Sequence, residues 1–226
     1  QVLTMKDYPF TDNDIRKLRP HKIRINNKKE VNISIPEEDN GKAELIEQQE
    51  DLKEQRDSIK IQAWLSVIGE KLGFKIWLPR SDRGRVLEIW NPQKDSLLEE
   101  LPLVFEETTL KTIRNIDVIW IKRRSIIRAF EVEDTTSIYS GILRMADLLS
   151  LQPMLDIKIH IVAPVSRRES VFQQITRPVF AVMEKGPLAE FCSYISYDSV
   201  NELSKEKNLV HMTDSIIDEY AEFIED

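Results

Sequence analysis

Residues 115–134, NIDVIWIKRRSIIRAFEVED, decide the fold of this chain. They predict two apolar strands joined by a basic turn, with Asp117 near the start of the first strand and Glu131 and Glu133 near the end of the second. Side chains alternate between the two faces of a strand, so Glu131 and Glu133 share one side. Two carboxylates that project together from an apolar strand repel each other, and a bound cation is the simplest compensation.

Asp117 lies on the neighbouring strand of the predicted hairpin and could supply a third oxygen ligand. Hard divalent ions favour a shell of carboxylates and water, so we expect a site for Mg²⁺, with Mn²⁺ as a substitute. The plainer interpretation is that these acids are exposed or pair with the basic residues of the same stretch. The joint pattern of strand, turn and strand with all three acids favours the metal site.

The composition is that of a globular protein, with 31% charged and 41% hydrophobic residues among 226. Cys192 is the only cysteine, so no intrachain disulfide can form, and we expect a reducing, cytoplasmic compartment. No apolar run approaches the roughly 20 residues of a membrane helix, so we expect no membrane partner. The chain begins with Gln1, and we expect it to be part of a longer protein.

Basic residues gather locally although the net charge is -7, a value that argues mildly against nonspecific coating of nucleic acid. The candidates for phosphate contact are Lys122, Arg123 and Arg124 in the turn and Arg167 and Arg168 on a later helix. A solvated basic surface is the alternative. Ser140 and Arg144 form a polar stripe on the helix that follows the acidic strand, and they could contact a phosphate or simply face solvent.

Residues 1–40 show little periodicity and predict an N-terminal arm or small subdomain, with a short helix at 12–18 and a strand at 31–35. Residues 41–226 form the main domain. Hydrophobic periodicity there predicts helices at 42–72, 97–104, 137–152, 166–176 and 212–223, and strands at 74–78, 86–90, 156–164 and 191–197, besides the two strands within 115–134 that a turn at 122–124 joins. Residues 81–84 are expected to form a turn, and Gly73 a helix stop.

The order helix, strand, strand, strand, helix, strand over residues 58–164 resembles the PD-(D/E)XK nuclease superfamily, the restriction-endonuclease-like fold. Asp117 in NID matches the first acid, and Glu131-Val132-Glu133 stands where the family has (D/E)XK. The departure is Glu133, which replaces the family's lysine and puts the lysine's role in doubt. A restriction enzyme with glutamate at this position resembles the chain here, so the change is compatible with activity.

The resemblance implies an α/β fold with a central mixed β-sheet flanked by helices, and a C-terminal extension over residues 165–226. It implies that Asp117, Glu131 and the carbonyl of Val132 hold the metal, with Glu133 as base or ligand of a second ion. The family often adds an acid or glutamine from the first core helix, to which Glu70, or less well Gln62, corresponds by location. It also uses a polar residue on the helix after the acidic strand, the place of Ser140 or Arg144.

The resemblance thus implies a magnesium-dependent DNA endonuclease of restriction or defence type. We expect DNA as the partner, with either a homodimer or a fused or associated defence subunit. The alternative is a nuclease-like domain that binds nucleic acid or a protein without cutting. A sugar hydrolase with paired carboxylates is weaker, because its two acids must flank a cleft, which one strand does not offer. No base-reading motif appears, so the recognised sequence is not predicted.

Overall fold

The computed structural model describes residues 18–25, 29–36, 41–133, 138–154 and 156–224, with side chains from residue 55 onward. The chain forms two compact units, Gln1–Gln49 and Glu50–Asp226. The first contains strands β1 (Leu18–Ile25) and β2 (Lys29–Pro36), which pair antiparallel. The strand expected at 31–35 is confirmed as part of β2, whereas the helix expected at 12–18 falls on residues 12–17, outside the described part, and on the first residue of β1.

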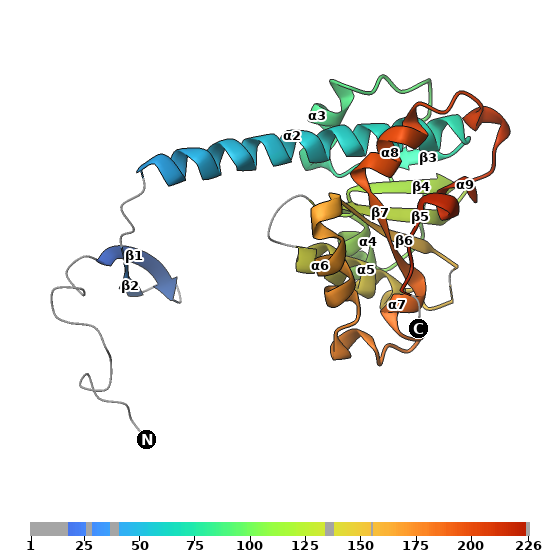
Figure 1. Cartoon of the computed structure of the whole chain (residues 1–226). Helices are drawn as coiled ribbons and strands as arrows, with labels where there is room; N and C mark the ends of the chain where they lie inside the picture. The colour runs from blue at the N-terminus through green and yellow to red at the C-terminus, as the bar shows by residue number, and fades with distance from the viewer. Residues whose placement is uncertain (1–17, 26–28, 37–40, 134–137, 155, 225–226) are drawn as a thin grey trace. The chain divides into compact units, whose positions relative to one another are not determined.

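The second unit is built on a five-stranded sheet in the order β3-β4-β5-β6-β7 (Figure 1). Strands β3 (Lys75–Trp77), β4 (Val118–Lys122) and β5 (Ser125–Val132) are antiparallel neighbours. Strands β6 (Lys158–Ala163) and β7 (Cys192–Ser196) continue parallel to β5. The sheet is therefore mixed, as the sequence predicted.

Helices cover both faces of this sheet, and each face has its own apolar core. Helix α2 (Gly41–Lys71) packs on one face through Leu65 and Ile68, together with α3 (Arg80–Leu87), α8 (Tyr197–Ser204) and α9 (Ile216–Tyr220). On the other face lie α4 (Glu107–Arg114), α5 (Ile138–Leu151), α6 (Arg168–Ile175) and α7 (Leu188–Phe191). This arrangement confirms the predicted α/β fold with a restriction-endonuclease-like core.

The register of the central hairpin sets the position of the acids. Val118 pairs with Phe130, so the start of β4 lies beside the end of β5. The two-residue turn at Arg123 and Arg124 closes the opposite end, and Arg123 adopts a left-handed φ of 58°. Asp117 therefore lies at the same end of the hairpin as Glu131 and Glu133.

Three segments differ from the predicted elements. Residues 81–84 lie in α3 instead of a turn, and the strand expected at 86–90 is absent, because Val86 and Trp90 are buried at helical spacing. Residues 97–104 contain no helix, while α4 follows directly at Glu107. The closing helix spans only Ile216–Tyr220, and α8 was not predicted. Short apolar runs such as VLEIW fit both periods, so packing decides between them.

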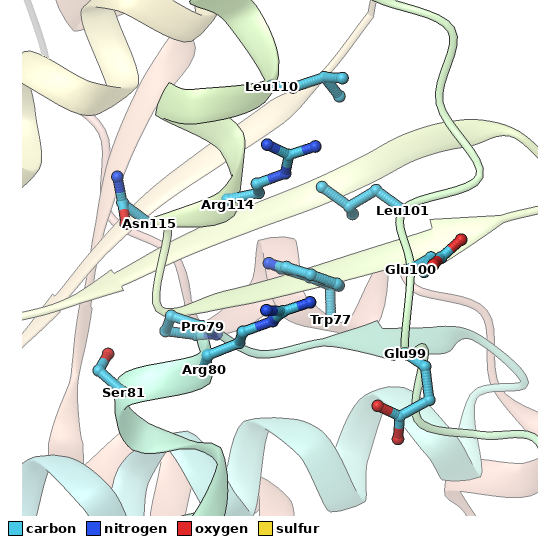
Figure 2. Close-up of a pocket in the computed structure, with 10 residues that line it drawn as sticks. All are labelled: Trp77, Pro79, Arg80, Ser81, Glu99, Glu100, Leu101, Leu110, Arg114 and Asn115. Atoms are coloured by element: carbon cyan, nitrogen blue, oxygen red, sulfur yellow. The ribbon is translucent and has the colours of Figure 1, made fainter. Parts of the chain in front are cut away.

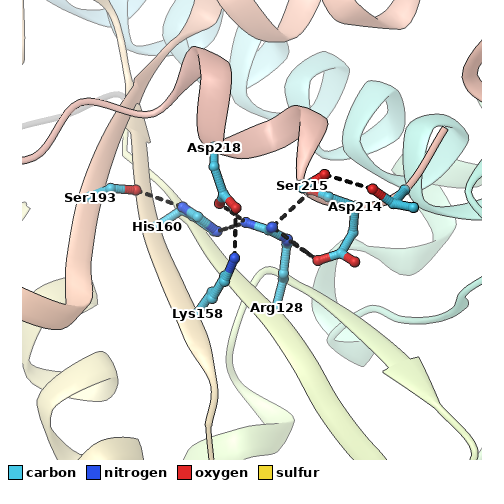
Figure 3. Close-up of polar contacts among 8 residues, drawn as sticks. Arg128, Lys158, His160, Ser193, Asp214, Ser215 and Asp218 are labelled. Carbon is cyan, nitrogen blue, oxygen red and sulfur yellow. Dashed lines mark hydrogen bonds and ion pairs between the residues drawn. The ribbon is translucent and has the colours of Figure 1, made fainter.

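The C-terminal segment is tied to the sheet by a buried arginine. Arg128 of β5 is fully buried, and its guanidinium forms ion pairs of 2.9 and 2.8 Å with Asp214 and Asp218 (Figure 3). His160 Nε2 lies 3.0 Å from Arg128 Nη1, and His160 Nδ1 lies 2.6 Å from Ser193 Oγ. Burial and the charge of Arg128 hold the pKa of His160 well below its ordinary value, so the imidazole is neutral. Nε2 accepts from Arg128, and Nδ1 donates to Ser193.

This cluster predicts a specific loss of stability. The double substitution Asp214→Asn and Asp218→Asn leaves the buried Arg128 charge without a carboxylate. We expect the free energy of unfolding at pH 7 to fall by about 3 kcal/mol, the usual cost of breaking a buried ion pair. Urea unfolding measures it. The control double variant Asp156→Asn and Glu184→Gln removes two exposed acids and should change stability by less than about 0.5 kcal/mol. Equal losses of stability in the two double variants would contradict the stabilising role of the Arg128 ion pairs.

Candidate active site

Three acidic side chains come together at one end of the hairpin. Asp117 directly precedes β4, Glu131 lies in β5, and Glu133 directly follows β5. The Oδ2 atom of Asp117 accepts a hydrogen bond of 2.8 Å from the backbone N–H of Val132. The first acid is thus fixed to the backbone between the other two. The three acids thus lie at the same end of the hairpin, and a metal site formed by all three stays a prediction.

Arg144 joins this group from helix α5. Its Nε and Nη2 atoms donate to Oε1 and Oε2 of Glu131 at 2.7 and 2.6 Å, a bidentate ion pair. Glu131 is fully buried in this pair, whereas the Arg144 side chain is 31% exposed. The sequence predicted that Arg144 contacts a phosphate or faces solvent. In the structure, its guanidinium pairs with Glu131, and the phosphate contact stays a prediction.

Burial changes the titration of two of these acids. Burial raises the pKa of Asp117 to about 6, while the Val132 hydrogen bond and the charge of Arg144 oppose the shift and the charge of Asp82 adds to it. Burial and then the charge of Asp117 raise the pKa of Glu131 well above its ordinary value, against the pull of Arg144. The charge of Arg144 therefore does not fully offset the cost of burying these two carboxylates.

Gly141 allows helix α5 to approach the acids. A Cβ atom at this position would collide with Oε1 of Glu133 and lie 3.2 Å from Cβ of Glu131. Any side chain at Gly141 would therefore displace the acidic end of β5. The sequence analysis did not single out Gly141, although a glycine within a helical pattern often marks a close approach.

Two further polar residues lie on the other side of Asp117. Gln62 of α2 is 3% exposed, and its Nε2 donates to Oδ2 of Asp82 at 3.2 Å. The Oε1 atom of Gln62 is buried without a hydrogen-bond partner. Asp82 of α3 was missed by the sequence analysis because its segment was expected to be a turn before a strand. Its charge reaches Asp117, so Gln62 and Asp82 adjoin the acidic group.

Glu70 holds a loop at the other end of α2. Its carboxylate accepts from Trp90 Nε1 at 3.2 Å and from the backbone N–H of Gln93 at 2.7 Å. Eight residues separate it from Gln62, which is about 12 Å along a helix. Of the two candidates on this helix, Gln62 is the one whose contacts lead to Asp117.

The predicted basic contacts are divided between two places. Lys122, Arg123 and Arg124 are exposed at the hairpin turn, one strand length, about 17 Å, from the acidic end. Arg167 and Arg168 follow β6, which runs parallel to β5, so they lie at the same sheet edge as the acids. Arg168 pairs with Glu169 and Glu222 at 2.7 Å. Ser140 is partly exposed on α5, one residue before Gly141.

The donor set suits a hard divalent cation in its chemistry. The carboxylates of Asp117 and Glu131 and the unpartnered amide oxygen of Gln62 are oxygen ligands, and a cation would stabilise the charged form of the two buried carboxylates, whose pKa values burial raises. Within the described residues no three His, Cys, Asp or Glu side chains converge as a formed ion shell. Arg144 takes both oxygens of Glu131, so an ion would compete with it.

The fold and this acidic site define the chain as a restriction-enzyme-like α/β domain. The family model of the type II restriction enzyme NmeDI C-terminal domain matches residues 35–224, and the chain belongs to this family. It is 30% identical over 161 residues to the type II restriction enzyme NmeDI of Neisseria meningitidis serogroup C, covering 68% of this chain and 44% of that enzyme. The chain thus spans less than half of this relative's length. No solved structure matches the chain.

No helix among the residues that the structure describes is long and apolar enough to cross a membrane.

The raised pKa of Asp117 predicts a pH-dependent stability. Between about pH 4 and pH 6 the folded carboxyl keeps a proton that the unfolded chain has released, so the free energy of unfolding falls as pH rises through this window. Asp117→Asn removes this titration while its amide oxygen still accepts from Val132. We expect the variant to exceed the parent protein by on the order of 1 kcal/mol above pH 6, and to match it near pH 4.

Urea unfolding in EDTA at several pH values measures the difference. Asp156→Asn, at an exposed position, is the control and should follow the parent at every pH. A constant offset between Asp117→Asn and the parent from pH 4 to pH 7 would contradict the raised pKa.

Proposed function

We propose that this chain is the nuclease-like domain of a restriction or defence enzyme and hydrolyses DNA phosphodiester bonds with Mg²⁺. The observation that carries the proposal is the position of Asp117, Glu131 and Glu133 at the same end of the β4–β5 hairpin, where Asp117 accepts a hydrogen bond from Val132 and the first two acids have raised pKa values. Membership in a restriction-enzyme family supports it. DNA is the partner that this family membership favours, and the pattern of the acids supports our proposal that the chain is of the PD-(D/E)XK type.

The proposed ion ligands are Asp117, Glu131 and the carbonyl oxygen of Val132. The buried Oε1 of Gln62 is a further oxygen that no protein donor occupies, and we include it in this set. A bound Mg²⁺ supplies polarisation of a phosphate oxygen and a lower pKa for a water molecule. Asp117 is already oriented by its hydrogen bond from Val132, so it needs little rearrangement to bind.

Glu133 and Arg144 have complementary roles in the proposed reaction. Glu133, in the place of the family's lysine, accepts the proton of the attacking water. Arg144 holds Glu131 in its buried position when no ion is bound. On release from Glu131 its guanidinium becomes a donor for a phosphate oxygen, which offsets the negative charge that develops during phosphoryl transfer. Arg144 would thus pair first with Glu131 and then with a phosphate of the substrate.

Ser140 and the remaining basic residues would bind the DNA backbone outside the reacting centre. Arg167, Arg168 and Ser140 lie near the acidic end of the sheet and suit phosphates close to the scissile bond. Lys122, Arg123 and Arg124, a strand length away, suit phosphates farther along the duplex. A homodimer or an associated subunit stays a prediction of the restriction type.

Cleavage assays test the proposal. The chain should nick or cut plasmid DNA with Mg²⁺ or Mn²⁺ and not with EDTA. Asp117→Asn and Glu131→Gln should abolish cutting because they remove ligand charge, whereas Glu133→Gln should retain residual cutting, slower by about 100 to 10,000-fold. Glu184→Gln, an exposed acid away from the site, is the control and should cut normally. Cutting that persists in EDTA, or in Asp117→Asn, rules out this mechanism.

A second function is favoured by the Arg144–Glu131 pair. Because Arg144 already satisfies Glu131 without an ion, the site is also compatible with a domain that binds nucleic acid or a protein partner and does not cut. The two functions differ in whether the acidic group takes up a divalent cation.

Calorimetry with Mn²⁺ separates these functions. If the site binds an ion, the parent chain should give a saturable heat that Glu131→Gln removes. Arg144→Met should bind Mn²⁺ several-fold more tightly, because the ion no longer competes with a bidentate guanidinium. Arg177→Met, an exposed arginine elsewhere, is the matched control. The absence of a saturable heat from both the parent and Arg144→Met supports the non-cutting function.

A further inference from the structure

A cavity of about 660 Å³ opens beside the acidic group (Figure 2). Its walls come from the end of β3, the start of α3, residues 99–101 and the end of α4. The volume is in the range of pockets that hold small ligands, from about 300 to 1,000 Å³. None of the proposed metal ligands or phosphate contacts lines it, so its role is not explained by the acidic group itself.

The cavity lies next to the acidic group on the same face of the sheet. Asn115 lines it and is two residues before Asp117, while Ser81 lines it and precedes Asp82, whose charge reaches Asp117. Trp77 pairs with Ile119 across β3 and β4, so its side chain shares a face with that of Asp117. If one unit of a polymeric substrate reacts at Asp117, the next unit of the same polymer would therefore lie in this cavity.

Positive charge gathers on one part of the cavity wall. Figure 2 shows Arg80 and Arg114 on either side of the Trp77 indole in that view. Arg80 is exposed, and among the residues that the structure describes no carboxylate pairs with it. Arg114 pairs with Glu107 at 2.8 Å, but both side chains are exposed, and such pairs contribute little stability. Both guanidinium groups can therefore turn to an anion at small cost.

Two further features of this wall point to a ligand with acceptor atoms. The Nε1–H of Trp77 is a buried donor without a hydrogen-bond partner, and the side chain is only 4% exposed. A buried donor left unpaired is costly, and an acceptor in the cavity would relieve the cost. Helix α3 begins at Arg80 after Pro79 with no side-chain cap, so its positive end faces the same space.

The acidic part of the wall fixes where an anion can lie. Glu99 and Glu100 line the side of the cavity opposite Ser81 and Asn115 in Figure 2, and Glu99 is paired with Arg83 at 2.7 Å. These carboxylates repel a phosphate, so the anion belongs between Arg80 and Arg114. The rest of the volume is left for the uncharged part of the ligand.

We propose that this cavity binds one nucleotide of the DNA strand, with its phosphodiester between Arg80 and Arg114, next to the phosphate held at the acidic group. The proposal rests on the proposed function, because it takes the strand at Asp117 to be DNA. The cavity thereby fixes the position of the strand at the reacting centre. Trp77 Nε1 donates to an oxygen of this nucleotide.

DNA binding measured without cleavage tests the site. Fluorescence anisotropy with a labelled duplex in EDTA gives the affinity at several salt concentrations. Arg80→Gln with Arg114→Gln should weaken binding by on the order of tenfold at 0.1 M salt, and reduce the slope of log affinity against log salt by roughly 2, about one for each lost phosphate contact. Arg56→Gln with Arg177→Gln removes the same charge at exposed positions elsewhere and should keep the parent slope.

The outcomes separate the site from the function. If the parent chain binds no DNA, the proposed function and the cavity proposal both fail. If it binds DNA but the Arg80 and Arg114 variant keeps the slope of the control, the cavity proposal alone is overturned. Equilibrium dialysis with a mononucleotide distinguishes the source of the phosphate. If the Arg80 and Arg114 variant loses mononucleotide binding but binds DNA like the parent, the cavity belongs to a free nucleotide and the strand proposal is overturned.

Discussion

The ion pair between Arg144 and Glu131 is the interaction on which the candidate site depends. Glu131 is fully buried, and a buried carboxylate keeps its charge only at a large cost unless a cation pairs with it. Arg144 supplies that charge from α5, and Gly141 lets the helix come close enough to deliver it. The packing of α5 against β5 therefore also determines the charge state of the acids.

Two arginines on the same sheet show how burial sets a residue's role. Arg128 is fully enclosed, with its donors shared among Asp214, Asp218 and His160, and it fastens the C-terminal segment to β5 and β6. Arg144 remains partly open, with a single carboxylate partner whose own pKa is raised. The first has its charge fully matched and is structural. The second lies in a group that still carries excess negative charge, which is the condition for taking up a cation or a phosphate.

The local pattern of the sequence was sufficient for the sheet but not for the loops around it. The hairpin, β3, β6, β7 and the helices α2, α5 and α6 were predicted because apolar runs with one clear period leave little choice. Residues 81–90 were misassigned, because Val86 and Trp90, four residues apart, fit the period of a strand as well as that of a helix. The residues of α4 also escaped prediction, although Thr109 and Ile113 are buried four residues apart.

The sequence by itself determined the mixed α/β fold and the position of Asp117, Glu131 and Glu133 at the same end of the hairpin, because strand alternation and hairpin register follow from neighbouring residues. Only the tertiary structure decided which partners these acids have. Arg144, Gly141, Asp82 and Gln62 reach them from three different helices, and such contacts depend on how helices pack across the sheet. The charge of a buried carboxylate depends on the groups within a few ångströms of it, and the separation of residues along the chain does not show which groups these are.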